Sequence, residues 1–475
     1  MSTVMTLPRI IQGGMGIAVS NWQLANTVSR SGQMGVVSGT ALDAAFVRRL
    51  QDGDSGGHLR RAMAHFPLTA VVADALRRYF LPDGRAGAKY KDLPMYRQGA
   101  SAERERLTML ACFVEVFLAK EGHEGVVGIN LLTKIQLPTL ASLYGAMLAG
   151  VDAVLMGAGI PKEVPAALDA LAEGRPARMR LEVEGQDADV TEQMRLDPAA
   201  HFPGTPPTLR RPLFLAIIAS SSLAIMLARK ASGKVDGFII EGPTAGGHNA
   251  PPRGEKTFNE RGEPLYGPRD VVDLDKVKEL NLPFWLAGGV GRRGSLKEAL
   301  AAGAAGIQVG TLFAFCDESG FTTEIKASVL SHVVSGEIEV FTDPVASPTG
   351  FPFKVVRWPD DPAKGVERER VCDLGYLRTA YRTPEGKLGY RCASEPVDAY
   401  VKKGGKVEDT EGRRCLCNAL LANIGHGQVR DNDVEQPLIT SGDDLVQLGE
   451  VLGGRTHYSA VDVIRYLLAE AAVAG

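Results

Sequence analysis

The chain has 475 residues, of which 45% are hydrophobic and 23% charged, and its formal net charge is -3. This composition excludes an intrinsically disordered chain, and the small net charge argues against a nucleic-acid or membrane partner bound through bulk charge. The 54 glycines exceed the usual share of ~7% of residues, which predicts tight turns and close approaches of the backbone to a ligand.

The N-terminal segment, MSTVMTLPRIIQGG, has no basic region followed by an apolar one, so we expect no signal peptide and a cytoplasmic location. The apolar run from Leu213 to Ala228 is shorter than the ~20 residues that a membrane span needs, and three serines interrupt it. We therefore interpret this run as a buried strand, a polar turn and a helix.

Short apolar segments alternate with helical patterns along most of the chain. Their nearly continuous apolar character is typical of parallel strands that are buried on both faces. In chain order the predicted strands are 9–12, 34–38, 126–130, 153–156, 213–219, 237–241, 284–287 and 306–309, and the predicted helices include one from about Asn21 and those at 139–148, 222–231 and 295–302. Eight strands with intervening helices predict an α/β protein with a (β/α)8 TIM-type barrel, with a doubly wound open sheet as the alternative.

Three stretches are longer than a barrel requires. We expect the barrel itself to comprise residues 1–40 and 125–335, with a helical insertion at 41–124 after the second strand. A polar, proline-rich surface insertion is expected at 174–211, before the fifth strand. A C-terminal extension at 336–475 contains a cysteine cluster and a final helix near 460–470.

Glycines stand at the ends of the last two predicted strands, where barrels of this class often bind phosphate. The seventh strand ends in Ala287-Gly288-Gly289 and the eighth in Gln308-Val309-Gly310-Thr311. Without a Cβ in the way, backbone N–H groups there can point at a phosphate. The alternative is that these glycines only permit tight turns.

Other strand ends also carry polar or glycine-rich residues. The first strand is followed by Gly13-Gly14-Met15-Gly16, which is not the G-x-G-x-x-G fingerprint of a dinucleotide-binding turn. Asn130 ends the third strand, where its amide either contacts a ligand or closes a turn. The sixth is followed by EGPTAGGH, residues 241–248, so His248 is a candidate to donate a hydrogen bond or a proton to substrate.

The motifs IIQGGMG, VGIN, EGPTAGGH, LAGGV and QVGT occur in this order at the predicted strand ends. With them the chain resembles the FMN-dependent nitronate monooxygenase (2-nitropropane dioxygenase) superfamily, which includes flavin enoyl-ACP reductases, over most of residues 8–355. The resemblance implies a TIM-type barrel that binds FMN, and Glu241 stands where nitronate monooxygenases often have Gln. The expected cofactor-binding residues are Gly14, Met15, Asn130, Glu241, Gly246, Gly247, Gly288, Gly289, Gln308, Gly310 and Thr311, with His248 as the catalytic residue.

One segment departs from the monooxygenase pattern. Monooxygenases of the best-understood type have a histidine base after the fourth strand, before a G-x-P turn, whereas residues 155–161 here read LMGAGIP. This form is similar to the enoyl reductases, whose AGGH histidine is matched by His248. The post-barrel segment 342–354, TDPVASPTGFPFK, also resembles the family and is expected to cap the pocket, with Lys354 as a candidate contact.

The resemblance implies an FMN-dependent oxidoreductase that acts on a small molecule, by oxidative denitrification of alkyl nitronates with O2. The alternative is an NAD(P)H-dependent enoyl-thioester reductase of fatty-acid or polyketide type. Its substrate would be an acyl thioester, and the insertion at 41–124 would be a docking surface for an acyl carrier protein. A third possibility is a flavin-binding scaffold without turnover.

Four of the six cysteines, Cys372, Cys392, Cys415 and Cys417, cluster near the C-terminus and are candidate ligands of zinc or of an iron–sulfur cluster. Their spacing includes one C-x-C and no C-x-x-C. Reduced structural or substrate-lining thiols are therefore the favoured interpretation, and no metal is assigned.

Overall fold

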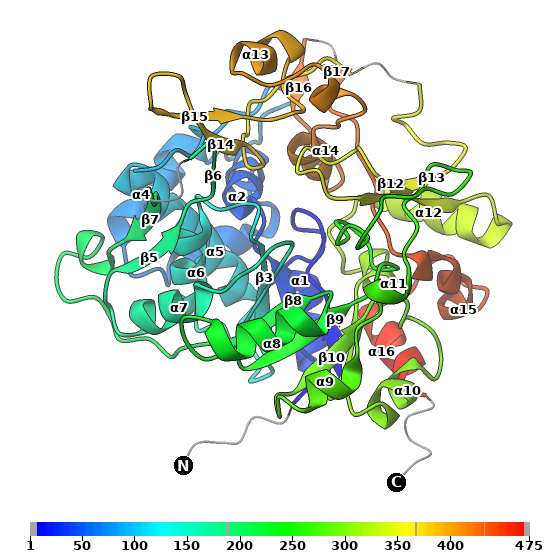
Figure 1. Ribbon diagram of the computed structural model, residues 1–475. Helices are drawn as coiled ribbons and strands as arrows, with labels where there is room; N and C mark the ends of the chain where they lie inside the picture. The colour runs from blue at the N-terminus through cyan, green and yellow to red at the C-terminus, as the bar shows by residue number, and fades with distance from the viewer. Residues whose placement is uncertain (1–6, 187–189, 366–367, 432, 470–475) are drawn as a thin grey trace.

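The computed structural model describes residues 7–186, 190–365, 368–431 and 433–469 (Figure 1). The start of the N-terminal segment and Glu470, at the end of the last expected helix, lie outside these residues. None of the described helices is long and apolar enough to cross a membrane.

Eight parallel strands form the central sheet, in the order β1-β11-β10-β9-β8-β4-β3-β2. The two end strands also meet, because the amide of Gln12 donates to the carbonyl of Met34 at 2.9 Å and Ile11 pairs with Met34 in a parallel bridge. The sheet is therefore a closed barrel, which confirms the (β/α)8 prediction over the open sheet. Its strands are β1 Ile10–Gln12, β2 Gly35–Ser38, β3 Val127–Leu132, β4 Ala153–Gly157, β8 Leu213–Ile218, β9 Gly237–Glu241, β10 Phe284–Ala287 and β11 Gly306–Val309.

The barrel interior is packed rather than open. A separate cluster of fully buried side chains, including Ile11, Leu155 and Trp285, fills it. The indole N–H of Trp285 donates to the carbonyl of Pro8 at 2.8 Å, so its one polar group is satisfied. Burial of each large side chain contributes roughly 1.5–3 kcal/mol, and the strand runs lack polar alternation because both strand faces are covered.

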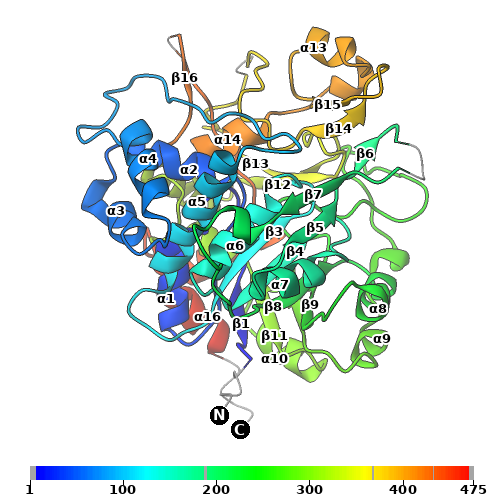
Figure 2. The same cartoon turned by 90° about the vertical axis from the view of Figure 1, so that its left-hand side faces the viewer.

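Helices surround the barrel (Figure 2). The long helix α5 packs against α1 and α6, in the crossover position between β2 and β3, and most of its residues are buried. The chain between residues 41 and 101 adds α2, α3 and α4 before it. The surrounding helices are α1 Trp22–Arg30, α2 Leu42–Gln51, α3 His58–Met63, α4 Thr69–Tyr79, α5 Ala102–Lys120, α6 Thr139–Leu148, α7 Val164–Ala172, α8 Ser221–Lys230, α9 Leu274–Lys278, α10 Ser295–Ala301, α11 Thr311–Ala314 and α12 Thr323–Ser335.

The stretch between α7 and β8 forms small strands outside the barrel. Strand β5 Ala177–Arg180 pairs antiparallel with β7 Gln193–Leu196. Strand β6 Val183–Glu184 instead pairs with β14 Thr379–Arg382, which belongs to the C-terminal part of the chain. This pairing joins two segments that are far apart in sequence.

The C-terminal part packs onto the barrel. Strands β12 Glu339–Asp343 and β13 Phe353–Arg357 form an antiparallel hairpin, and α16 Ala460–Leu468 contacts α1 and α10. Buried residues from this part belong to the same hydrophobic core as the barrel helices. Its remaining elements are β15 Leu388–Arg391, α13 Val397–Lys402, α14 Leu416–Ala422, β16 Val429–Arg430, β17 Asp433–Val434 and α15 Leu448–Leu452.

Candidate functional site

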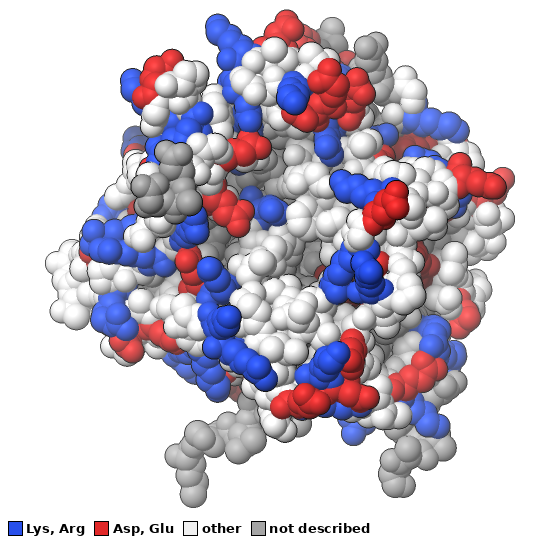
Figure 3. All heavy atoms as spheres, in the orientation of Figure 1, with Lys and Arg blue, Asp and Glu red and all other residues white. Residues whose placement is uncertain are grey.

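A cavity of about 210 Å³ lies at the carboxyl ends of the barrel strands. The face seen in Figure 3 is hollowed near its centre, where uncharged side chains predominate. Among the described residues that line the cavity none is Lys or Arg. An anionic group bound here would therefore depend on backbone N–H donors rather than on paired charges.

Two glycines of the cavity wall allow contacts that a larger residue would block. A Cβ on Gly14 would lie 2.2 Å from the Cβ of Asn130, so only glycine lets the β1 loop pass this side chain. Gly288 has a φ of +82°, and a Cβ there would lie 2.9 Å from the amide nitrogen of Ala245. The glycines after β1 and β10 are thus required by the shape of the site.

Several polar groups of the wall have no protein partner. In the described part of the chain, the backbone N–H groups of Gly288, Gly310 and Thr311 donate to no protein acceptor. The side-chain oxygen of Gln308 is buried and likewise unpartnered. Buried polar groups in folded proteins are nearly always hydrogen-bonded, so their gathering around one cavity indicates a ligand site.

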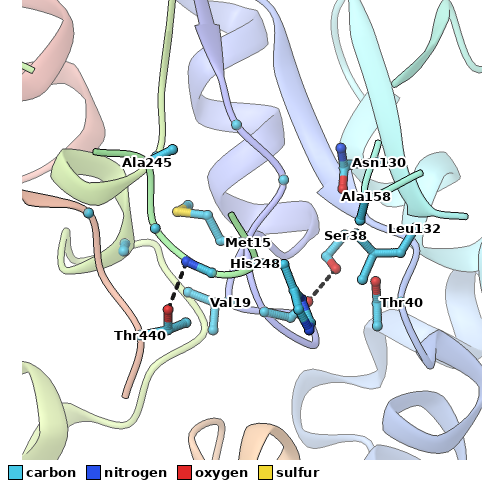
Figure 4. Close-up of a pocket in the computed structure, with 18 of the residues that line it drawn as sticks. Met15, Val19, Ser38, Thr40, Asn130, Leu132, Ala158, Ala245, His248 and Thr440 are labelled. Atoms are coloured by element: carbon cyan, nitrogen blue, oxygen red, sulfur yellow. Dashed lines mark hydrogen bonds between the residues drawn. The ribbon is translucent and has the colours of Figure 1, made fainter. Parts of the chain in front are cut away.

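His248 lies in the wall of the cavity (Figure 4), and its imidazole contacts the hairpin β12–β13. Its Nε2 is 2.7 Å from the hydroxyl of Ser347, and its ring meets Phe353 edge-on, with ring centroids 4.9 Å apart. Burial and, to a smaller extent, the charge of Lys134 lower the pKa of His248 to about 4. The imidazole is therefore neutral at pH 7, and it can accept a proton or donate its N–H hydrogen bond.

Glu241, the last residue of β9, lies in the wall between two cavities. Burial alone raises the pKa of its carboxyl group to about 7, with no hydrogen bond or charge from a described residue offsetting it. A neighbouring cavity of about 190 Å³ is lined by Glu241, His248 and residues such as Tyr266 and Phe351. Both Glu241 and His248 line the two cavities, so either side chain can contact a substrate that enters from the second one.

The C-terminal part of the chain also supplies residues of the wall, none of which was among the expected site residues. Thr440, Ser441, Gly442 and Asp444 line the main cavity. The hydroxyl of Thr440 accepts a hydrogen bond from the amide of Gly247 at 2.9 Å (Figure 4). These residues follow β11 by more than a hundred positions and carry no motif, so no pattern in the sequence indicated them.

Lys354 does not line the cavity. Its buried ammonium group donates to Thr342 Oγ1 at 2.9 Å and to Asp443 Oδ1 at 2.7 Å. The expected direct contact is therefore wrong, because this ion pair holds the lysine against residue 443. Lys354 instead fixes the segment that supplies Ser441 and Asp444 to the wall. The cap expected at 342–354 contributes Phe353 to the cavity.

The structure brings the expected site residues together with one exception. Gly289 is not among the residues that line the cavity, and its φ of +70° is one that the turn after β10 reserves for glycine. The others, all of which line it, are Gly14, Met15, Asn130, Glu241, Gly246, Gly247, His248, Gly288, Gln308, Gly310 and Thr311.

The four C-terminal cysteines also lie together, in a separate small cavity, and Cys417 lines both cavities. The other two cysteines, Cys112 and Cys316, are buried elsewhere. No three His, Cys, Asp or Glu side chains of the described ranges are arranged to hold a single metal ion.

Comparison with known proteins supports the class that the fold and motifs suggest. The nitronate monooxygenase family model matches residues 209–343, which contain the motifs EGPTAGGH, LAGGV and QVGT. The resemblance to this superfamily is therefore confirmed. A probable nitronate monooxygenase of Staphylococcus saprophyticus is 31% identical over 155 residues, which are 32% of this chain and 37% of the relative. The alignment thus spans little more than a third of the relative's length.

Among solved structures, FabK from Thermotoga maritima is similar at 16% identity with a TM-score of 0.49, over 98% of this chain and 93% of the other. A nitroalkane oxidase from Streptomyces ansochromogenes is 15% identical with a TM-score of 0.46, over 98% and 96%. The enoyl reductase domain of MlnA from Bacillus amyloliquefaciens is 11% identical with a TM-score of 0.45, over 96% and 92%.

Proposed function

We propose that the main cavity binds FMN and that the protein is an FMN-dependent oxidoreductase of the nitronate monooxygenase type, acting on a small-molecule substrate. The observation that carries this proposal is the set of unpartnered backbone N–H groups at Gly288, Gly310 and Thr311 beside the buried, unpartnered oxygen of Gln308. A phosphate and the polar edge of a ring would satisfy both kinds of group.

The roles of the wall residues follow from their chemistry. Bound FMN supplies a ring that accepts and returns two electrons. The amides after β10 and β11 would hold its phosphate, while the side-chain amides of Asn130 and Gln308 would meet the ring. Gly14 and Met15 would lie along the cofactor as the wall of the β1 loop.

The substrate would enter from the second cavity, between Glu241 and His248. An alkyl nitronate is already an anion, so its oxidation needs no protein base to remove a proton. This fits the Gly157-Ala158-Gly159 turn after β4, where no histidine is present. Neutral His248 would donate a hydrogen bond to the nitro oxygens, and Glu241 in its protonated form would avoid repelling the anion.

The second candidate is an NAD(P)H-dependent enoyl-thioester reductase. Glu241 favours it, because a carboxyl group with a pKa of about 7 next to the substrate cavity can supply the proton that reduction of a double bond requires. For this function we expect an acyl carrier protein to dock on the helices within 41–124.

Anaerobic reduction of the bound flavin separates these functions. Bleaching by propyl nitronate and not by NAD(P)H supports the monooxygenase. Bleaching by NAD(P)H followed by reoxidation with crotonyl thioester supports the reductase. A flavin that neither reagent reduces would leave a binding scaffold without turnover.

A further inference from the structure

The four clustered cysteines come from three separate elements of the C-terminal part. Cys372 lies in the loop before β14, and Cys392 directly follows β15. Cys415 caps the N-terminus of α14, and Cys417 lies in its first turn. All four line one small cavity, which has room for about one water-sized sphere. The fold therefore brings together four thiols whose spacing in the sequence did not indicate a common site.

The four sulfur-bearing side chains share one space. Cys372, Cys392, Cys415 and Cys417 all line the same cavity, and Cys392 and Cys417 are buried. Thiolates at such a site need positive charge beside them, which a bound metal centre would supply.

The surroundings of the sulfurs suit thiolate ligands. The side-chain amide of Asn418 donates to the sulfur of Cys415 at 3.4 Å. Arg378 is the one charged residue among the described residues that line this cavity. Hydrogen bonds and positive charge near sulfur stabilise the anionic state of a thiolate-bound cluster.

The size of the cavity distinguishes between metal centres. Zinc bound by four thiolates lies about 2.3 Å from each sulfur, which leaves no space for a water-sized sphere at the centre. The cavity that the four cysteines line has room for about one such sphere, and no group of three or more His, Cys, Asp or Glu side chains among the described residues is placed to hold one metal ion. A multi-iron cluster held by four cysteines requires a wider separation of the sulfurs.

We propose that Cys372, Cys392, Cys415 and Cys417 bind an iron–sulfur cluster beside the main cavity. Leu377, Leu416 and Cys417 line both cavities, so a single layer of residues separates the cluster from the site proposed for FMN. Binding of the cluster does not depend on whether the main cavity holds FMN.

The test uses the full chain, produced with ample iron and purified without oxygen. Iron, zinc, acid-labile sulfide and FMN are measured per folded chain, and the dithionite-reduced protein is examined by low-temperature electron paramagnetic resonance. We expect about four irons and four sulfides per chain, with a cluster signal distinct from a flavin radical. Chains without iron that bind FMN would overturn only this inference, and iron-loaded chains without FMN would overturn only the proposed function.

Variants locate the ligands. Replacing Cys372 or Cys415 by Ala should lower iron content at least ~5-fold, while Cys112→Ala, a buried thiol outside the cluster, should leave it unchanged. Circular dichroism shows whether each variant is folded, and reconstitution of the folded wild-type chain with ferrous iron and sulfide covers loss during purification. Stoichiometric zinc, a disulfide between these cysteines, or four free thiols in the reconstituted wild type would each overturn the proposal.

Discussion

His248 and Ser347 lie 99 positions apart, yet Nε2 of the imidazole is 2.7 Å from the serine hydroxyl. A parallel-strand barrel alone would leave the loop after β9 without this support. The contact forms because His248 pairs with Phe353 of β13 in an antiparallel bridge, which places the hairpin β12–β13 against the loop. The C-terminal part thus orients the one imidazole that lines the main cavity among the described residues.

The depressed pKa of His248 predicts a loss of stability in acid. The unfolded imidazole takes up a proton below about pH 6.5, whereas the folded one stays neutral until about pH 4. The stabilisation is therefore complete above pH 6.5 and declines as the pH falls through this window. Because the ring faces the cavity, we expect a decline on the order of 1–2 kcal/mol between pH 7 and pH 5.

Urea denaturation at pH 7 and pH 5 measures this effect against His248→Gln, which cannot titrate. The variant should lose less stability than the wild type over the same interval. Identical pH dependence of the two proteins would show that the folded imidazole titrates normally.

The raised pKa of Glu241 predicts the opposite effect: a loss of stability as the pH rises. Its folded pKa of about 7 lies above the ordinary value of 4.5, so the folded state retains a proton that the unfolded state has lost. The stabilisation is complete below pH 4.5 and disappears as the pH rises through 7. Glu241→Gln should therefore raise the melting temperature relative to wild type at pH 8 and not at pH 4.5. An equal shift at both values would contradict the assigned pKa.

Gly14 and Gly13 form a matched pair for testing the shape of the site. A methyl group at Gly14 would overlap Asn130, whereas one at Gly13 meets its nearest atom, Cγ of Gln308, at 3.4 Å, an ordinary contact. We expect Gly14→Ala to destabilise the protein by about 1–3 kcal/mol and to lower FMN affinity. Gly13→Ala should change thermal stability much less. Equal melting temperatures for the two variants would refute the close approach.

Replacement of Lys354 tests whether the segment around Asp443 shapes the cavity. Replacing it by Met removes the ion pair with Asp443 and leaves the hydroxyl of Thr342 without its donor. Breaking a buried pair typically costs several kcal/mol, although Asp443 is half exposed, which reduces the cost here. We expect Lys354→Met to weaken FMN binding several-fold, measured by flavin fluorescence, while Lys297→Met on the exposed face of α10 has no effect.

The barrel could be predicted from the sequence because each strand is marked by the pattern of its own few residues. Segments such as 213–219 and 237–241 are apolar without alternation, and burial of both faces requires this. The strand-end glycines were also recognisable, since backbone shape restricts these positions to glycine. By contrast, Ser441 and Gly442 reach the cavity through long-range packing, which leaves no periodic signal. Lys354 was assigned to the wrong contact because the sequence could not reveal its partner Asp443.

The cysteine cluster also depends on long-range packing that the sequence could not reveal. Their spacing argued against a metal site, since ligands close in sequence are the usual signal. The fold brings Cys372, Cys392 and the pair at 415 and 417 together from different elements, and sequence spacing does not record such an arrangement.

The binding of FMN is the central claim of this account, and titration of the folded, flavin-free chain with FMN tests it most directly. We predict saturable quenching of flavin fluorescence at one FMN per chain, with the affinity reduced in Gly14→Ala. A folded chain that does not quench FMN fluorescence at any concentration would contradict the claim.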